Sequence, residues 1–516
     1  MAKKVSSKLT TLTYPTNCNV SHVESIRTLI LIILIIFIIR LLIGGNNTII
    51  LIDIILAFFV IIHIILKLSA IFKPWSKTYV NPDHKYKPFV SIHIACKNEP
   101  AETVIKTVKA LTKLNYPNYE VIVINNNNHD KQNWSKIQRY INKCGKNFKF
   151  IHLDKIDGFK SGALNYLNNY IIDKRTDIEA IVDCDYIVIP DFLNETVGYF
   201  KDPRIGIVQA PQDYYNVNQF NIGLFYEYRS FFEIVMHQAQ QLNLVTFTGT
   251  MGLIRADLLK KGLKWNEWCI TEDVEAGTHI NSLGYKGVYV DKSLGKGLMP
   301  FDYASLIKQR QRWTYGNMQI IRKDFFHVIA NQSLSIKQKI AFFAQLATWF
   351  HFELILAFIY LIINTLQFFG YSGSNILFTN NLMLALLLFS LASNFIYFLI
   401  GMRKRTSVFN NIKAFLIHYG LLYVMSFSWI TCLLGRKLGF IVTKKERTQN
   451  NIPFRQYSKE FTIVVMLFVG LILRYFNNEN IKLDLLVIII FSSIELFGIF
   501  YLRRSFIKPI EESSTK

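Results

Sequence analysis

The sequence predicts a doubly wound α/β domain inserted between transmembrane helices. Two long apolar runs lie before residue 70 and five more follow residue 340. Between them, residues 75–325 alternate short strand-like runs with helical patterns, which predicts a largely parallel sheet covered by helices. The chain has 516 residues, 51% of them hydrophobic, which suffices for one such domain and several spans.

The N-terminal part predicts a cytosolic segment followed by two spans. Residues 1–27 are polar, and no cleavage site of small residues follows the first apolar run, which argues against a signal peptide. Residues 28–68 contain two apolar runs joined by GGNNT. Asp53 lies near one end of the second run, so we expect it at the membrane interface.

The central region contains five runs rich in β-forming residues. A helical pattern, AETVIKTVKALTKL (101–114), follows the first of them. Ligands of doubly wound sheets bind at the carboxyl ends of the strands, so polar residues directly after these runs are candidate site residues. The predicted strands are FVSIHIA (89–95), YEVIVI (119–124), FKFIHL (148–153), EAIVDCD (179–185) and IGIVQA (205–210).

The charge of the late loops predicts which late runs cross the membrane. If every run crossed, the basic segments 402–411 and 435–460 would face opposite sides, against the tendency of Lys and Arg to stay cytosolic. We therefore expect 412–434, with its aromatic residues, to lie in the interface. Six spans and two cytosolic termini result. The expected units after the α/β domain are two helices (343–401), an interfacial segment (405–460), two helices (461–502) and a cytosolic tail (503–516).

The formal net charge of +22 is explained by this topology. Basic loops that face the cytosol and membrane lipids account for the excess, so we expect no nucleic-acid partner. The localisation that follows is the cell (inner or cytoplasmic) membrane, crossed several times. Six cysteines form no CxxC pair and predict reduced thiols.

Asp183 and Asp185 predict a metal site. They follow the apolar residues EAIV, and in a strand their side chains would point the same way. Two carboxylates on one side can share Mg²⁺ or Mn²⁺ with diphosphate oxygens. The alternative interpretation is a turn or a helix cap.

A third acidic group lies in the sequence EWCITEDVEAG (267–277). Glycosyl transfer with inversion needs one carboxylate that takes the proton from the acceptor hydroxyl, and Glu272 and Asp273 are the carboxylates of this motif. The alternative is a helix N-terminus with Thr271 as cap and Glu272 and Asp273 near the positive end of the dipole. The two interpretations are compatible.

The stretch ASLIKQRQRWTYGNMQIIRK (304–323) has the apolar spacing of an amphipathic helix. Gln309, Arg312, Trp313 and Gly316 fall on one of its faces. Arg312 can bind phosphate oxygens in a forked geometry, and Trp313 can stack on a sugar ring. A basic helix beside the membrane with an interfacial tryptophan is the alternative.

Taken together, these motifs resemble the family 2 glycosyltransferases, in particular the membrane-embedded, processive synthases of cellulose, hyaluronan and other β-glycans. The resemblance covers about residues 89–445. It rests on DCD, TED and QRQRW, which match the family's DxD, TED and QxxRW, together with four supporting segments. These are CKNEP (96–100), YPNYEVIVI (116–124), KSGALN (160–165) and FTGTMGLIR (247–255).

The resemblance implies a GT-A-type fold for residues 75–325 and a hexosyltransferase activity on a UDP-sugar. It implies that Asp183 and Asp185 bind the metal, that Asp273 is the base, and that Trp313, with Thr271 and Glu272, borders the acceptor. Further donor contacts are implied for Asn98, Glu99, Asn125, Lys160, Asp183, Gln309 and Arg312. FIVTKK (440–445) resembles the gating loop of bacterial cellulose synthase, with Phe440, Val442, Thr443 and Lys445 at the matching positions.

A finer likeness points to UDP-glucose as donor and a β-1,3-linked or related glucan as product. It rests on VQAPQDY (208–214), GKGLMP (295–300) and the longer surroundings of TED and QRQRW. One position departs from the family. The first family aspartate should fall in VINNNNHD, where this chain has Asn125, and Asp130 follows five residues later. Asparagine still offers an acceptor to a base N–H but carries no charge.

Three alternatives remain open at the level of the sequence. A non-processive transferase that glycosylates a membrane lipid would use the same fold and metal site. A transporter with an incidental cytosolic domain would place polar residues in its spans, and these are sparse here. A degenerate protein would bind UDP without turnover, which Asn125 keeps open.

Overall fold

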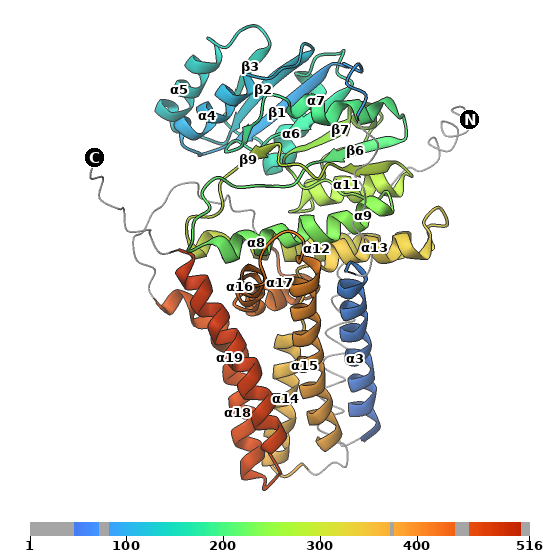
Figure 1. Ribbon diagram of the computed structural model, residues 1–516, viewed down its shortest axis with the longest axis vertical. Helices are drawn as coiled ribbons and strands as arrows, with labels where there is room; N and C mark the ends of the chain where they lie inside the picture. The colour runs from blue at the N-terminus through green and yellow to red at the C-terminus, as the bar shows by residue number, and fades with distance from the viewer. Residues whose placement is uncertain (1–45, 72–81, 372–375, 439–453, 507–516) are drawn as a thin grey trace.

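The computed structural model describes residues 46–71, 82–371, 376–438 and 454–506. Figure 1 shows an α/β domain at one end, long helices at the other, and a layer of helices lying across between them. Residues 28–43, expected to form the first span, lie outside the described residues. So do the gating-loop positions Phe440, Val442, Thr443 and Lys445.

The α/β domain is built on a seven-stranded sheet of order β3-β2-β1-β4-β7-β6-β8. The first four strands in that order are parallel to one another, and β6 is parallel to β8, but β7 is antiparallel to both of its neighbours. The expected largely parallel sheet is therefore a mixed one. The strands are β1 (Val90–Cys96), β2 (Tyr119–Asn126), β3 (Phe148–Leu153), β4 (Ile178–Ile181), β6 (Ile205–Gln209), β7 (Gly252–Arg255) and β8 (Lys286–Tyr289).

Both faces of the sheet are covered, as expected of a doubly wound fold. Alternate residues of β2 enter different cores: Val121 and Val123 pack in the same cluster as residues of α4 and α5, whereas Ile122 and Ile124 pack against α6. The helices and minor strands of the domain are α4 (Ala101–Leu111), α5 (Lys131–Ile141), α6 (Phe159–Tyr170), α7 (Phe192–Thr196), η1 (Val197–Lys201), α10 (Ala256–Lys260), α11 (Glu272–Ser282), β5 (Ile187–Val188) and β9 (Gly295–Lys296).

A layer of helices separates the sheet from the long helices (Figure 1). One part of it is a nearly continuous helical stretch, α8 (Ile222–Ser230), η2 (Phe231–Met236) and α9 (His237–Gln241). The other part is α12 (Tyr303–Ala330), the helix predicted around QRQRW, followed by α13 (Ile336–Ala347). This layer brings α12 under the carboxyl ends of the strands.

The long helices extend away from this layer (Figure 1). Of the described helices, α15 and α19 are each long and apolar enough to cross a membrane, and α14 is apolar but shorter. Six spans therefore stay a prediction. The buried Asp53 of α3 accepts a hydrogen bond from Thr379 of α15 at 2.7 Å. The helices are α3 (Asn46–Ser69), α14 (Glu353–Phe368), α15 (Ile376–Gly401), α18 (Thr462–Phe476) and α19 (Lys482–Arg504), with η3 (Phe454–Phe461) before α18.

The segment expected to lie in the interface forms two helices, α16 (Val408–Tyr419) and α17 (Leu422–Leu433), bent by 46°. It starts and ends on the side of the α/β domain. Arg405, just before α16, pairs with Asp291 of that domain, and the Tyr315 hydroxyl of α12 donates to the Arg436 carbonyl oxygen just after α17 at 2.6 Å. Residues just before α16 and just after α17 thus lie beside the α/β domain and α12, and residues 439–453 of the second basic segment lie outside the described residues.

Candidate active site

A large cavity opens at the carboxyl ends of β1 and β4, with an empty volume of about 1060 Å³. The loops after these strands, the segment before β7, the start of α11 and one face of α12 form its walls. Ten predicted site residues line it: Glu99, Lys160, Asp183, Asp185, Thr271, Glu272, Asp273, Gln309, Arg312 and Trp313.

Asp183 and Asp185 line the cavity from a turn and not from a strand. Strand β4 ends at Ile181, and the Tyr186 N–H donates to the Asp183 carbonyl oxygen at 3.0 Å. The strand argument for their common direction is therefore wrong, although both side chains reach the cavity. The Asp183 N–H donates to Thr250 Oγ1, and the Leu298 N–H donates to Asp185 Oδ2, both at 3.0 Å.

Lys160 bridges two walls of the cavity. Its Nζ donates to Asp183 Oδ1 at 2.8 Å and to the Gly249 carbonyl oxygen at 2.9 Å. Burial alone would lower the pKa of Lys160, but the negative charges of Asp183 and Glu272 raise it. The ammonium therefore stays charged, where it can offset the charge of a diphosphate.

The TED triplet, Thr271 to Asp273, occupies the start of α11. The helix-terminus interpretation and the site interpretation are therefore both compatible with the structure. Thr271 is the N-cap residue, and Glu272 and Asp273 lie in the first turn, where the helix dipole favours negative charge. Asp273 Oδ1 accepts from the Val274 N–H at 2.9 Å. This bond fixes the carboxylate against the helix and leaves its other oxygen toward the loop that contains Gly249.

Gly249 of FTGTMGLIR makes room for Asp273. Its φ of +84° is a left-handed conformation that favours glycine. A Cβ at this position would lie 2.4 Å from Asp273 Oδ2, closer than atoms can approach. The glycine therefore brings the loop before β7 against the candidate base.

The carboxyls of Glu272 and Asp273 are both harder to ionise than usual. Burial raises the pKa of Asp273, and burial together with the neighbouring Asp273 raises the pKa of Glu272. Lys160 and Arg312 oppose both shifts. A raised pKa makes a carboxylate a better proton acceptor, as a general base requires.

Helix α12 contributes the three predicted residues from one face. Gln309 accepts a hydrogen bond from the Tyr228 hydroxyl of α8. The Trp313 ring meets Tyr228 edge to face at 5.7 Å and lies 5.4 Å from the Trp349 ring. At Gly316, on the same face, a Cβ would lie 2.3 Å from Thr271 Oγ1, so this glycine allows α12 to pack against the TED triplet.

Arg310, the neighbour of Gln309, has a role that no sequence pattern indicated. Its side chain is fully buried and ion-pairs with the equally buried Glu227. The guanidinium lies 4.2, 4.8 and 4.4 Å from the ring centroids of Tyr228, Trp313 and Trp349. Arg310 therefore holds the aromatic group around Trp313. The RQR pattern gave no signal that one arginine faces the cavity and the other the interior.

Two predicted donor contacts do not line the cavity. Asn98 is exposed, and Asn125 is buried with its amide engaged: Nδ2 donates to the Lys97 carbonyl oxygen at 3.1 Å, and Oδ1 lies 3.1 Å from His152 Nδ1. Asp130 caps α5 by accepting from the Asn133 N–H at 3.1 Å. Asn126 lines the cavity instead. In a run of four asparagines the sequence could not distinguish which one does.

The cavity has the donor chemistry that a divalent cation needs. Asp183 and Asp185 provide hard carboxylate oxygens, which Mg²⁺ and Mn²⁺ prefer, and a diphosphate would provide the remaining oxygens. Asp183 accepts a hydrogen bond from Lys160 at 2.8 Å, and Lys160 can share the charge of the diphosphate. The residues therefore fit such an ion.

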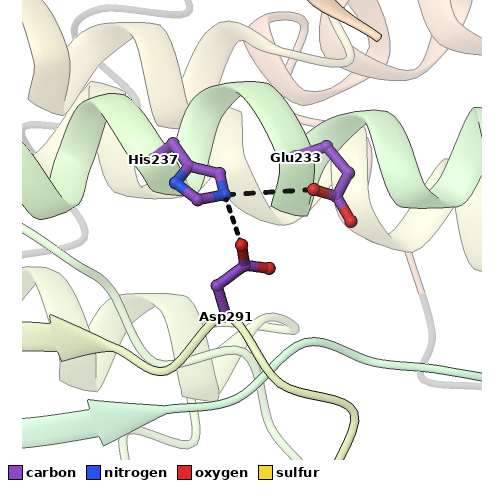
Figure 2. A group of neighbouring side chains, drawn as sticks. All are labelled: Glu233, His237 and Asp291. Carbon is purple, nitrogen blue, oxygen red and sulfur yellow. Dashed lines mark ion pairs between the residues drawn. The ribbon is translucent and has the colours of Figure 1, made fainter. Parts of the chain in front are cut away.

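A second group of possible metal ligands, Glu233, His237 and Asp291, lies outside this cavity (Figure 2). His237 Nε2 is 3.3 Å from Asp291 and 3.9 Å from Glu233. Both carboxylates are also ion-paired with Arg405, and Glu233 pairs with Arg229. Arginines already compensate these charges, so we interpret the group as a junction between the domain and the loop before α16.

Part of the chain matches a known protein family. Residues 88–316 match the family described as glycosyltransferase-like family 2. The chain is 25% identical over 260 residues to glucomannan 4-beta-mannosyltransferase 7 of Arabidopsis thaliana, a match that covers 49% of this chain and 47% of that protein. It is 28% identical over 304 residues to the poly-beta-1,6-N-acetyl-D-glucosamine synthase of Staphylococcus epidermidis, covering 57% of this chain and 71% of that protein.

Among solved structures, a mannosyltransferase from Pyrobaculum calidifontis, in complex with GDP-Man and Mn²⁺, aligns with 72% of this chain and 97% of its own. The sequence identity is 16% and the TM-score is 0.47. The chain spans about half the length of the plant relative that it matches.

Proposed function

We propose that this chain, whose residues 88–316 belong to the family 2 glycosyltransferases, transfers a hexose from a nucleoside diphosphate sugar to a growing β-glycan with inversion. The observation that carries the proposal is the convergence of Asp183, Asp273 and Trp313 in one cavity. These residues come from the turn after β4, from α11 and from α12, which are far apart in the sequence.

The donor would bind through its diphosphate. Lys160 and Arg312 supply positive charge on the walls, and Asp183 and Asp185 would hold Mg²⁺ or Mn²⁺. When bound, that ion would neutralise charge that develops on the departing diphosphate. The Tyr228 hydroxyl donates a hydrogen bond to Gln309 Oε1, which holds the Gln309 side chain at the wall of the cavity.

Asp273 would act as the general base. It takes the proton from the acceptor hydroxyl as the oxygen forms a bond to the anomeric carbon, and the bond between that carbon and the diphosphate oxygen breaks. The nucleoside diphosphate leaves with the electron pair. Trp313 would stack on the acceptor sugar and hold its hydroxyl near Asp273, since both line the same cavity.

The finer parts of the proposal are the donor, processivity and export. The sequence motifs favour UDP-glucose, whereas the named relatives are a mannosyltransferase and an N-acetylglucosamine polymer synthase. Helices long and apolar enough to cross a membrane extend away from the α/β domain, which supports a membrane location; synthesis on the cytosolic side and delivery of the glycan across the membrane are part of the proposal. Membrane lipids would surround these helices.

The test is incubation of the full-length protein in lipid with radiolabelled UDP-glucose, UDP-N-acetylglucosamine or GDP-mannose. We expect one donor to give a long polymer, which a linkage-specific glycanase then digests. A single sugar on an extracted lipid would instead support the lipid transferase. Binding of UDP without release of product would support a degenerate protein.

A further inference from the structure

A chain of buried polar side chains connects the long helix α14 with the layer that contains α8 and α12 (Figure 1). Its four members are Glu353, His351, His418 and Glu227. Glu353 begins α14 and His351 lies just before it, whereas His418 lies in α16 and Glu227 in α8. Each of the four is at most 2% exposed. We call these residues the histidine chain.

Every ring nitrogen of the two histidines faces a hydrogen-bond partner. His351 Nδ1 lies 3.1 Å from Glu353 Oε2. His418 Nδ1 lies at the same distance, 3.1 Å, from Glu227 Oε1. The two rings meet through their Nε2 atoms, which are 2.9 Å apart. All of these distances are typical of hydrogen bonds, so the histidine chain consists of three hydrogen bonds in series.

The number of hydrogens in the histidine chain follows from this geometry. Three hydrogen bonds need three hydrogens, one in each gap between the four side chains. A neutral imidazole carries one N–H, so two neutral histidines supply two hydrogens, and ionised carboxylates supply none. One extra proton is therefore bound within the chain. It offsets the charge of one buried carboxylate, which lowers the cost of burying the chain.

Lys67 of α3 shows where the extra proton lies. Its Nζ is 3.3 Å from His418 Nε2, and an ammonium group can only donate. His418 Nε2 is therefore an acceptor, and the hydrogen between the two rings belongs to His351 Nε2. His418 is then neutral, with its hydrogen on the Nδ1 that faces Glu227. The extra proton lies in the remaining gap, between His351 Nδ1 and Glu353.

The surroundings of the histidine chain hold it in one arrangement. The Ser390 hydroxyl of α15 donates to Glu353 Oε1 at 2.6 Å, so both oxygens of this carboxyl are engaged. Lys67 also donates to Asn394 of α15. The further titratable side chains that face the histidine chain are His63 of α3, Arg310 of α12, Tyr397 of α15, Tyr419 of α16 and Glu495 of α19. With helices packed around them, the four side chains have little freedom to rearrange while all three hydrogen bonds are present.

The histidine chain ends at the group that holds Trp313. Glu227 accepts from His418 with Oε1 and pairs with the buried Arg310 through Oε2. The Arg310 guanidinium lies against the Trp313 and Trp349 rings, and the Trp349 ring is 6.5 Å from the ring of His418. The chain therefore fixes Glu227, Glu227 fixes Arg310, and Arg310 fixes the ring that borders the cavity.

We propose that His351, His418 and Glu353 are positioning residues for Trp313, and that the proton held between His351 and Glu353 keeps them in the active arrangement. When hydroxide removes this proton, water forms and one of the three gaps is left with two lone pairs that repel each other. The series of hydrogen bonds that fixes Glu227 then breaks. This inference rests on the proposed transferase function. Loss of the proton weakens acceptor binding and spares donor binding, because none of the four residues of the chain lines the cavity that contains Asp183.

Glu353→Gln tests the proposal, because an amide supplies the third hydrogen permanently. Its N–H fills the gap to His351 Nδ1 without an added proton, and its oxygen still accepts from Ser390. In the unmodified protein we expect transfer to fall about tenfold per pH unit on the alkaline side, since one proton is lost. In Glu353→Gln this fall should disappear or move up by about one pH unit or more. The acid side of the profile, set by Asp273, should not change.

Two further variants separate this role from a general loss of stability. Glu102→Gln, the same change at an exposed position in α4, is the matched control and should keep the alkaline fall. Glu353→Leu removes the partner of His351, so the acceptor KM should rise about tenfold at every pH while UDP affinity stays the same. An alkaline fall that Glu353→Gln leaves in place, or an acceptor KM that Glu353→Leu leaves unchanged, overturns the inference.

Tryptophan fluorescence of the full-length protein in lipid tests the link to Trp313 without catalysis. The difference between the unmodified protein and Trp313→Phe isolates the signal of that ring. We expect this signal to change as the pH rises into the alkaline range, and to stay constant in Glu353→Gln. Constant fluorescence of the unmodified protein over the same range overturns the inference even where the variants do not fold. Absence of product from every donor would refute the transferase function, and the fluorescence change would still test the histidine chain on its own.

Discussion

At the scale of single residues, the site depends on how Asp273 is held. Its Oδ1 accepts from a backbone N–H at the start of α11, and the glycine at position 249 leaves space for Oδ2. Burial raises the pKa of its carboxyl, whereas Lys160 and Arg312 lower it. The net increase in pKa makes this carboxylate a stronger proton acceptor than an exposed aspartate.

The first prediction concerns this base. Asp273→Asn keeps the shape of the side chain but cannot take a proton, so transfer should fall by roughly 10²–10⁴-fold. Binding of UDP, measured by calorimetry, should remain. Asp257→Asn, at an exposed position in α10, is the control and should retain transfer. Full activity of Asp273→Asn would refute the assigned role.

A second residue-scale prediction concerns Trp313. Trp313→Ala removes the ring that is proposed to stack on the acceptor sugar, so synthesis of long polymer should suffer more than donor binding does. A stacking contact of this type contributes about 1 kcal/mol, so the acceptor KM should rise several-fold. Product length on a gel and UDP affinity measure the two effects. Polymer of unchanged length and yield would contradict the stacking role.

At the scale of elements, α12 shows what the sequence could predict and what it could not. Its apolar spacing placed Gln309, Arg312 and Trp313 on one face, and all three line the cavity. The interior role of Arg310 depends on Glu227 in α8, which lies 83 positions away in the chain. No local pattern identifies such a partner, because ion pairs between distant helices depend on packing.

The strands likewise show which features a local pattern predicts and which depend on distant partners. Long apolar runs predicted β1, β2, β3 and β6 to within one or two residues at nearly every end. Strand β7, GLIR, has only four residues, one of which is a glycine. It forms a strand because β4 and β6 pair with its two edges. Its reversed direction, which makes the sheet mixed, could therefore not be predicted from periodicity.

The Arg310–Glu227 pair carries the element-scale prediction. Arg310→Met leaves a buried carboxylate without its guanidinium partner, which should lower the free energy of unfolding by about 3–5 kcal/mol. Arg310→Met combined with Glu227→Gln removes both charges and should recover part of this loss. Thermal unfolding of the purified protein in detergent measures both variants. A double variant no more stable than Arg310→Met would show that the pair is not what holds the aromatic group.

At the scale of the whole molecule, the question is how the α/β domain is fixed to the helices beneath it. The sequence predicts from charge alone that the two basic loops lie on the domain's side, and Arg405 and Arg436, at the ends of the segment between these loops, contact Asp291 and Tyr315. Charge counting describes a whole loop. It could not show that Arg405 pairs with two specific carboxylates, Glu233 and Asp291, at the junction drawn in Figure 2.

The last prediction concerns the ion pair between Arg405 and Asp291 at this junction. Burial alone would raise the pKa of Asp291, but its hydrogen bond with His237 and the charges of His237 and Arg405 lower it to about 2. A lowered pKa means that the ionised carboxylate stabilises the fold above its ordinary pKa of 3.8, and that this contribution is lost as the pH falls from there toward 2. Its size is about 2 kcal/mol.

Arg405→Ala should therefore destabilise the protein at pH 7 and bring its stability closer to that of the unmodified protein as the pH falls below 4. Lys404→Ala, at an exposed position in the same loop, is the control and should have little effect. Hydrogen exchange should also increase at residues 286–291 and 402–407, because Arg405 joins these two segments. Equal destabilisation at every pH, with no change in exchange at residues 286–291, would mean that Arg405 supports only its own loop and that other contacts fix the domain to the helices.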